Sequence, residues 1–215
     1  MSQTEDQQIQ ELKEKWEQYG KYVIIALIAV VSGVIGGQSW NAYKEGDLER
    51  ASASYDVMME AMQEKQVEIA MSEGGRLIES HPNSPYATMA ALAVAKMEVE
   101  KGDTQSARTR LAWAIDHANM EGLAHVARLR LAQLMIDAGE LDPALTKLNI
   151  SETGKFEGTY AALRGDIYVL QGKRSEARTA YESALTDTEL SPQLRTFVQM
   201  KLDNLGSAVS NETAS

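Results

Sequence analysis

The chain has 215 residues and carries 21 Lys and Arg against 31 Asp and Glu, which gives a formal net charge of -10. A chain this acidic repels phosphate backbones, so we do not expect it to bind nucleic acid. It contains no cysteine, which excludes disulfides, thiol catalysis and most structural zinc sites.

An uncharged segment near the N-terminus predicts a membrane-spanning helix. Residues 22–43 hold no charged side chain, and Lys21 and Lys44 bracket them. A helix of this length measures about 33 Å, which is enough to cross a hydrocarbon core of about 30 Å. Residues 1–21 are too long and too acidic for the start of a cleavable signal peptide, so we expect an uncleaved signal anchor.

The basic residues around this span predict its orientation. Three lysines precede it within residues 1–21, whereas Lys44 and Arg50 follow it closely. Because basic residues favour the cytoplasmic side, the bias of three to two predicts a cytoplasmic N-terminus and a single-pass, type II protein.

Small residues mark one face of the predicted span. Gly33 and Gly37 form a GxxxG pair, and Ala29 lies one turn earlier. Small residues at this spacing let two membrane helices approach closely, although glycine is also common in such helices without this role. Ala29, Gly33 and Gly37 are therefore our candidates for packing against another membrane helix.

The rest of the chain contains a repeated helical pattern. Its reference points are Gly102, Gly139 and Gly172, which are 37 and 33 residues apart. Small residues recur seven positions before and five positions after each glycine, and larger ones recur nine positions after it. These columns hold Ala95, Ala132 and Gly165, then Ala107, Ala144 and Ala177, then Leu111, Leu148 and Tyr181. Small residues let two helices cross closely, and each glycine is expected to end a first helix in a left-handed conformation.

This spacing is typical of tetratricopeptide repeats, although a generic bundle of helical hairpins is the alternative. We therefore predict an all-α fold, in which one transmembrane helix at 22–43 precedes a tetratricopeptide-like solenoid at 44–205. Within it, residues 47–81 form a helix pair with a weaker pattern. The clearer units are repeats at about 88–121, 125–154 and 158–190, a capping helix at 192–205 and a disordered tail at 206–215.

No catalytic constellation is visible in the sequence. It lacks the GxSxG, Walker, GxGxxG and HExxH motifs. The three histidines, His81, His117 and His125, are expected to be ordinary loop or surface residues. We therefore expect no catalytic residue, metal, cofactor or small-molecule substrate. A hydrolase that depends on these histidines is the weakest alternative.

A solenoid of this kind binds partners through the groove lined by the first helix of each hairpin. Some positions on these helices will pack between helices instead. The candidate groove is mixed in charge rather than basic. It consists of Met89, Leu92, Lys96, Val126, Leu129, Gln133, Thr159, Ala162 and Asp166.

Several short segments carry a resemblance to a known family. They are LKEKWEQYGK at 12–21, WNAY at 40–43, LRLA at 129–132 and LRGD at 163–166, followed by Gly172 and by Ala177 with Arg178. With the anchor and the repeats, the chain resembles the YfgM-type ancillary subunit of the bacterial Sec translocon over nearly its whole length. The resemblance implies an inner-membrane protein of a Gram-negative bacterium, with residues 1–21 in the cytoplasm and residues 44–205 in the periplasm.

The same resemblance implies the partners. They are the SecYEG channel, a periplasmic chaperone of the PpiD type, and exported polypeptides that pass from one to the other. It implies no catalytic residues. A second interpretation stays open, in which the solenoid is an anchored periplasmic adaptor for envelope assembly or cell division, because groove residues do not name a ligand.

Overall fold

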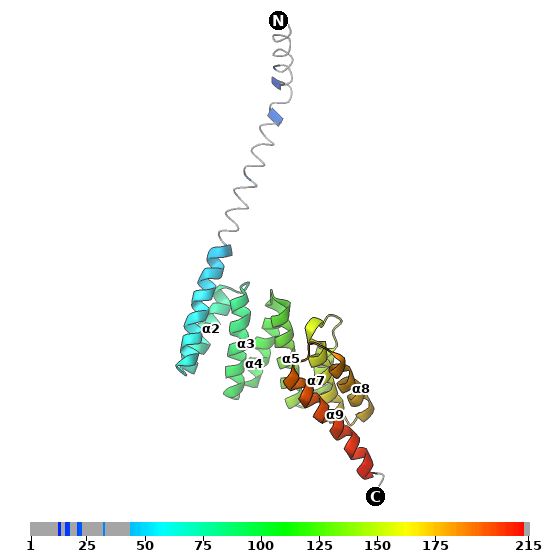
Figure 1. Ribbon diagram of the computed structural model, residues 1–215. Helices are drawn as coiled ribbons and strands as arrows, with labels where there is room; N and C mark the ends of the chain where they lie inside the picture. Colours follow the sequence, from blue (N-terminus) through cyan, green and yellow to red (C-terminus); the bar gives the residue numbers. More distant parts are fainter. Residues whose placement is uncertain (1–12, 14–15, 18–20, 23–31, 33–43, 213–215) are drawn as a thin grey trace. The chain divides into compact units, whose positions relative to one another are not determined.

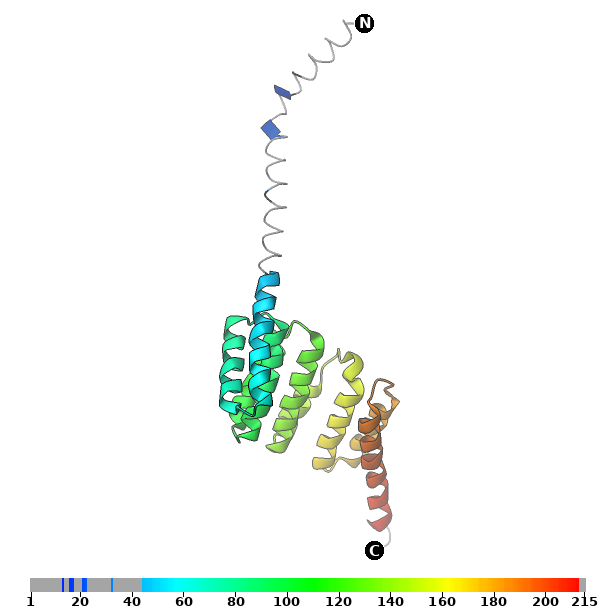
Figure 2. The same ribbon diagram turned by 60° about the vertical axis from the view of Figure 1, so that its left-hand side comes forward.

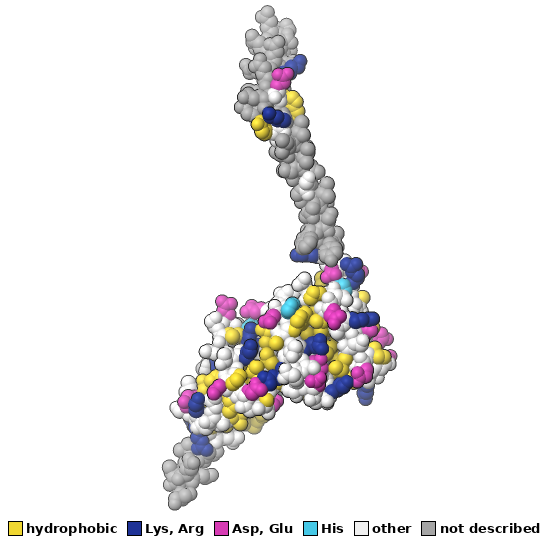
Figure 3. All heavy atoms as spheres, turned by 180° about the vertical axis from the view of Figure 1, so that it is seen from behind, with side chains coloured by type: hydrophobic (Ala, Val, Ile, Leu, Met, Phe, Trp, Pro, Cys, Tyr) yellow, Lys and Arg dark blue, Asp and Glu magenta, His cyan; other side chains and the backbone are white. Residues whose placement is uncertain are grey.

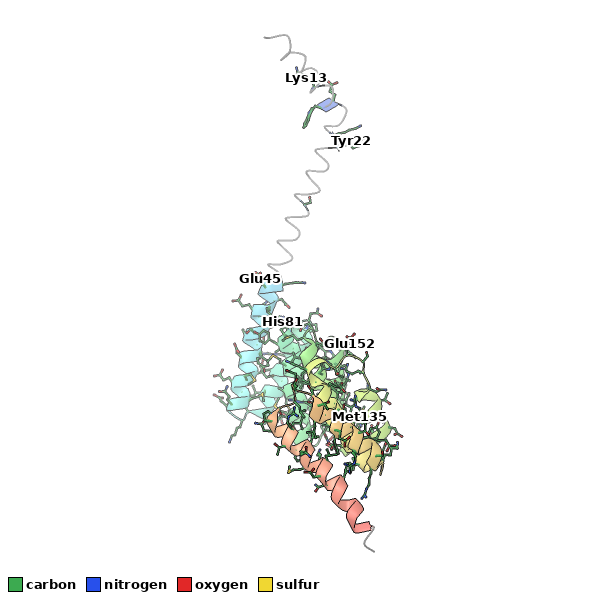
Figure 4. The ribbon with its side chains drawn as sticks, turned by 45° about the vertical axis from the view of Figure 1, so that its right-hand side comes forward. Lys13, Tyr22, Glu45, His81, Met135 and Glu152 are labelled. Atoms are coloured by element: carbon green, nitrogen blue, oxygen red, sulfur yellow. The ribbon has the colours of Figure 1, made fainter. Side chains whose placement is uncertain are left out.

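The computed structural model describes residues 13, 16–17, 21–22, 32 and 44–212, with side chains as far as Gly206. It divides into two compact units, residues 1–50 and residues 51–215. In the first unit, Lys13, Tyr22 and Glu45, which Figure 4 labels, are helical and exposed.

The predicted membrane span at 22–43 lies outside the described residues, apart from Tyr22 and Ser32. The packing candidates Ala29, Gly33 and Gly37 lie outside them too. Among the residues that the structure does describe, no helix is both long enough and apolar enough to cross a membrane.

The second unit is an array of helical hairpins that lie side by side (Figures 1 and 2). A first helical segment covers residues 51–63. The elements that follow are α2 (Val67–Ser80), α3 (Pro85–Glu100), α4 (Thr104–His117), α5 (Glu121–Asp137), α6 (Leu141–Leu148), the short 3-10 helix η1 (Gly154–Phe156), α7 (Glu157–Leu170), α8 (Arg174–Thr186) and α9 (Pro192–Glu212). Each α-helix from α2 to α9 packs on the next, and α5 also contacts α3 and α7. Residues 44–212 contain no strand, so the predicted all-helical array is confirmed for this unit.

The three turn glycines close their hairpins as predicted. Gly102, Gly139 and Gly172 have φ angles of 84°, 77° and 73°, in the left-handed region. At the first of these turns, the amide of Gly102 donates to Val99 O at 2.9 Å and the amide of Asp103 donates to Glu98 O at 2.8 Å. The same pair of hydrogen bonds recurs at the other two glycines. This is the Schellman arrangement, which satisfies carbonyls left free at a helix end.

A fourth hairpin closes in the same way without a glycine. Lys65, 37 residues before Gly102, has a φ of 60°. Its amide donates to Met62 O at 3.1 Å, and the amide of Gln66 donates to Ala61 O at 2.8 Å. Residues 51–63 and α2 therefore form a hairpin of the same kind, which the sequence pattern showed only weakly because lysine occupies the turn position.

Small residues let the two helices of a hairpin cross closely. A Cβ atom placed on Gly165 would lie 2.5 Å from Tyr181 Cδ1, so the tyrosine ring lies directly against the glycine backbone. In the first hairpin the sizes are reversed. Met58 is the large residue there, and a Cβ atom placed on Gly74 of α2 would lie 2.9 Å from Met58 Sδ. In the first hairpin the large side chain therefore comes from the first helix, whereas in the α7–α8 hairpin it comes from the second.

Several helix boundaries differ from the sequence-based expectation by a few residues. The second repeat begins at Glu121 rather than at residue 125, because Met120 precedes α5 without a side-chain cap, and the sequence therefore carries no start signal there. Helix α9 continues to Glu212, so residues 206–212 are described as helix where we expected a disordered tail. Gly206 does not adopt a positive φ, and no proline follows it, so nothing local ends the helix.

Candidate protein-binding groove

The nine candidate groove residues lie on α3, α5 and α7, but only some of them reach the surface. Leu92 is 7% exposed and Ala162 is 5% exposed, so both belong to the core. Val126 and Leu129 pack partly buried against the core clusters. Leu92 and Ala162 therefore support the helices, whereas Val126 and Leu129 keep part of their surface accessible.

The five remaining positions are accessible as well. Lys96 and Gln133 are exposed, and Met89, Thr159 and Asp166 are half-buried. Lys96, Gln133 and Asp166 share one structural position, six residues before the turn glycine of their hairpin. The structure thus brings these three side chains into one row across successive hairpins.

Two hollows join along this row, and we call them together the groove. The first hollow, about 370 Å³, lies between α3 and α5. The second, about 690 Å³, extends from α5 over α7 and α8 to α9. Gln133 lines both, so it stands at their junction. Lys96 lines the first hollow and Asp166 lines the second.

A hydrogen-bonded cluster anchors α9 to the wall of the second hollow. The Lys201 ammonium lies 2.6 Å and 2.7 Å from the two carboxylate oxygens of Asp166, and Tyr181 Oη donates to Asp166 Oδ1 at 2.7 Å. The same ammonium lies 4.5 Å from the centre of the Phe197 ring. Burial and the neighbouring Asp166 carboxylate raise the pKa of Tyr181, so the phenol stays protonated and keeps donating. Asp166 therefore joins α7, α8 and α9.

The structure adds groove residues that the sequence pattern did not identify. Arg130 lines the first hollow, and its Nη1 donates to Leu92 O at 3.3 Å. Val99 and Val169, 38% and 42% exposed, lie three residues before their turn glycines. This recurrence of valine could have been found in the sequence. The contribution of α9 could not have been predicted, because its lining residues lie outside the repeated pattern. They are Lys201, Asn204 and Leu205.

Hydrophobic side chains are not confined to the interior of the unit. Figure 3 shows them gathered in a band on one face, with charged side chains on either side of it. Exposed apolar surface flanked by polar groups is a usual mark of a protein-binding site.

The expectation that His125 is a loop or surface residue is wrong. It lies in α5 and is only 3% exposed. Its Nδ1 lies 3.0 Å from Tyr160 Oη in α7, and its ring contacts Phe156 with the centroids 4.9 Å apart. The partner comes from the next hairpin, which local sequence could not reveal. His117, in contrast, is exposed and stacks on Trp113 with ring centroids 4.3 Å apart.

The third histidine, His81, follows the end of α2 (Figure 4). Among the side chains that the structure describes, no three His, Asp or Glu residues are grouped so that they could hold a metal ion.

Comparison with known proteins agrees with this architecture. A family model described as a tetratricopeptide repeat-like domain matches residues 13–207. A Haemophilus influenzae protein named ancillary SecYEG translocon subunit is 32% identical over 94% of this chain and 97% of its own length. A protein of the same name from Aggregatibacter actinomycetemcomitans is 30% identical over 80% of this chain and 83% of its own.

A solved structure extends the agreement to the fold. The structure described as a functional characterization of Pseudomonas aeruginosa PilF superposes with a TM-score of 0.59 at 14% identity, over 77% of this chain and 72% of that one. At this identity the likeness concerns the fold alone. The family model and the two relatives lead to one assignment: the chain belongs to the family of ancillary SecYEG translocon subunits and carries their tetratricopeptide repeat-like domain.

Proposed function

We propose that this chain is a membrane-anchored, non-enzymatic adaptor that associates with the SecYEG translocon and binds other proteins through its groove. The observation that carries the proposal is the similarity to ancillary SecYEG translocon subunits over 94% of the chain. The groove supports it, because two hollows with apolar walls offer a binding surface that spans several hairpins.

The partners in this proposal are the translocon itself, a periplasmic chaperone of the PpiD type and exported polypeptides. An anchor beside the channel would hold the groove close to emerging chains. Such tethering raises the effective concentration of a binding surface, so modest groove contacts suffice for capture. The adaptor would thus link export to folding in the periplasm.

The anchor in this proposal is the uncharged segment 22–43, in the inner membrane with the N-terminus in the cytoplasm. Its length suits a bilayer, and the lysines that precede it favour this orientation. Ala29, Gly33 and Gly37 would pack against a helix of the translocon.

Crosslinking in living cells tests the partners. A photoreactive residue at Gly33 should capture translocon subunits, and one at Lys96 should capture chaperone or exported chains, both identified by mass spectrometry. The control position is Lys147, which is exposed on α6 and lines neither hollow. If Gly33 captured only proteins of envelope assembly or cell division, the Sec assignment would fail and the second interpretation would replace it.

Protease treatment of spheroplasts tests the topology. Residues 44–205 should be digested together with a periplasmic control protein, while a cytoplasmic control survives. Protection of this domain in spheroplasts whose periplasmic control is cut would contradict the proposed orientation.

A further inference from the structure

The charged side chains that line the groove differ in sign from the chain as a whole. The first hollow is lined by Lys96, Arg130 and Glu100. The second is lined by Arg174, Lys201 and Asp166. Four cations therefore face two anions, a local charge of +2 on a chain whose net charge is -10. An acidic partner is repelled by the chain in general but attracted by these groove side chains.

The anions of the groove are already engaged. Asp166 accepts hydrogen bonds from Tyr181 and Lys201. Glu100 lies 3.7 Å from the Lys96 ammonium across one exposed helical turn, and such exposed pairs are weak. The guanidinium of Arg130 makes one long hydrogen bond, 3.3 Å to Leu92 O. Lys96 and Arg130 are thus the cations best placed to meet an incoming carboxylate.

The walls of the groove are apolar. Those of the first hollow are formed by Ala95, Val99, Leu111 and Leu134. Those of the second are formed by Ile136, Val169, Leu170 and Leu205. Val169 and Leu170 are 42% and 60% exposed, so apolar area remains to be covered. A partner must therefore supply apolar side chains as well as negative charge.

The size of the hollows indicates the conformation of the partner. One turn of α-helix, about 5.4 Å long and 10–12 Å across with its side chains, fills more than about 400 Å³, whereas the first hollow measures about 370 Å³. An extended chain can instead place single side chains in each hollow and cross Gln133 between them, because it advances about 3.3 Å per residue.

We propose that the groove binds an extended polypeptide segment that carries both apolar side chains and carboxylates, with the carboxylates at Lys96 and Arg130 and the apolar side chains in the two hollows. This inference rests on the proposed protein-binding function and names the chemistry of the chains it accepts. It also makes α9 part of the binding surface, since Lys201, Asn204 and Leu205 line the second hollow.

Peptide binding to the full chain in nanodiscs of zwitterionic lipid tests the proposal. The probes are three fluorescein-labelled twelve-residue peptides of alternating leucine and serine, in which two serines are replaced by aspartate, lysine or asparagine. Fluorescence anisotropy should show the aspartate peptide binding roughly tenfold more tightly than the lysine peptide. Added salt should narrow this difference, since the Debye length falls to about 3 Å at 1 M.

Two variants locate the site. Lys96→Glu with Arg130→Glu should abolish or reverse the preference for aspartate, whereas the doubly charge-reversed control Lys147→Glu with Lys65→Glu should leave it unchanged. Both control residues are exposed and line neither hollow. Gln133→Trp, at the junction, should weaken all three peptides without changing the circular dichroism spectrum.

The results of these binding experiments distinguish the proposed peptide from other occupants of the groove. Equal binding of the three peptides, or a preference that the control variant changes as strongly as the groove variant, would overturn the proposal. So would peptide binding that disappears as the chain dimerises in size-exclusion chromatography, because the occupant would then be a second copy. Failure of peptide binding while Gly33 still crosslinks to the translocon would remove this inference alone. Peptide binding without translocon crosslinks would remove the proposed Sec association instead.

Discussion

Gly165 shows how one residue sets the distance between two helices. The Tyr181 ring lies against its backbone, and that ring is 1% exposed and hydrogen-bonded to Asp166, so it cannot move aside. Gly165→Ala should therefore destabilise the chain by about 1–3 kcal/mol through overpacking, even though alanine favours helix. Urea denaturation of the full chain, followed by circular dichroism, measures this.

A second glycine supplies the control for this prediction. Gly75 lies inside α2 with nothing within 4 Å of an added Cβ atom. Gly75→Ala should stabilise the chain by about 0.5–1 kcal/mol, because only helix propensity changes. If both variants shifted the free energy of unfolding in the same direction, close packing would not be the reason for Gly165.

The backbone conformation of Lys65 lowers the stability of the fold. Its φ of 60° places a side chain in the left-handed region, which costs an L-residue roughly 1–2 kcal/mol. Lys65→Gly should raise the free energy of unfolding by about 0.5–1 kcal/mol after the greater flexibility of unfolded glycine is counted. The reciprocal variant Gly102→Ala, at the equivalent turn with open space around it, should lower it by about 1 kcal/mol. The urea midpoints of the two variants, compared with that of the parent chain, test whether the turn conformation sets these differences in stability.

At the scale of elements, the sequence reveals a hairpin where its signals are local and conventional. Gly102, Gly139 and Gly172 mark three turns, and their left-handed backbones agree with that prediction. The alignment of the repeats did not include the first hairpin, because Lys65 replaces the turn glycine. In addition, Met58 is large where the other repeats have a small residue, and Gly74 is small where they have a large one. Complementary size across two helices is a property of a pair of positions, and a column-by-column alignment does not detect it.

The same reasoning applies to the groove. Lys96, Gln133 and Asp166 recur at one position of the repeat, so their common row was predictable, and the structure places them along the two hollows. The burial of Leu92 and Ala162 depends on how closely neighbouring hairpins pack, and the wall formed by α9 depends on where the last helix turns back. Both are tertiary effects with no local sequence signal.

Neighbouring hairpins are also joined by charge. Both amino groups of the Arg108 guanidinium on α4 donate to the Glu140 carboxylate before α6, one of them at 2.8 Å. The hydrogen bond to Arg108 holds the pKa of Glu140 below its ordinary value of 4.5. A carboxyl whose folded pKa is lowered stabilises the fold above its unfolded pKa, and that contribution is lost as the pH falls through the folded pKa.

This linkage predicts a pH dependence. As the pH falls below about 4.5, the urea midpoint of the parent chain should fall more steeply than that of Glu140→Gln, which has no proton to gain. Arg108→Met should give the same shallower slope, and the double variant should add nothing further. Parallel slopes for all four proteins would show that the pair does not link stability to pH.

At the scale of the whole molecule, the helical unit has three core clusters rather than one. The first includes residues from 51–63 to α5, and the last joins α7, α8 and α9 around Tyr181 and Val198. In an array where each hairpin packs mainly on its neighbours, a local defect should spread to adjacent hairpins and then fade.

Val198 allows this to be measured. It is fully buried in the last cluster, and Val198→Asp would place an unpaired charge among apolar side chains, which is strongly destabilising. Hydrogen exchange should then become faster in α7, α8 and α9 but stay slow in α2, α3 and α4, since no residue of the last cluster belongs to the first. Met200→Asp introduces the same charge in the same helix at a residue that is 50% exposed, and it should leave exchange unchanged throughout. Equal loss of protection along the whole array would mean that the hairpins fold as one cooperative unit. In that case α9 would stabilise the distant first hollow as well as form the wall of the second.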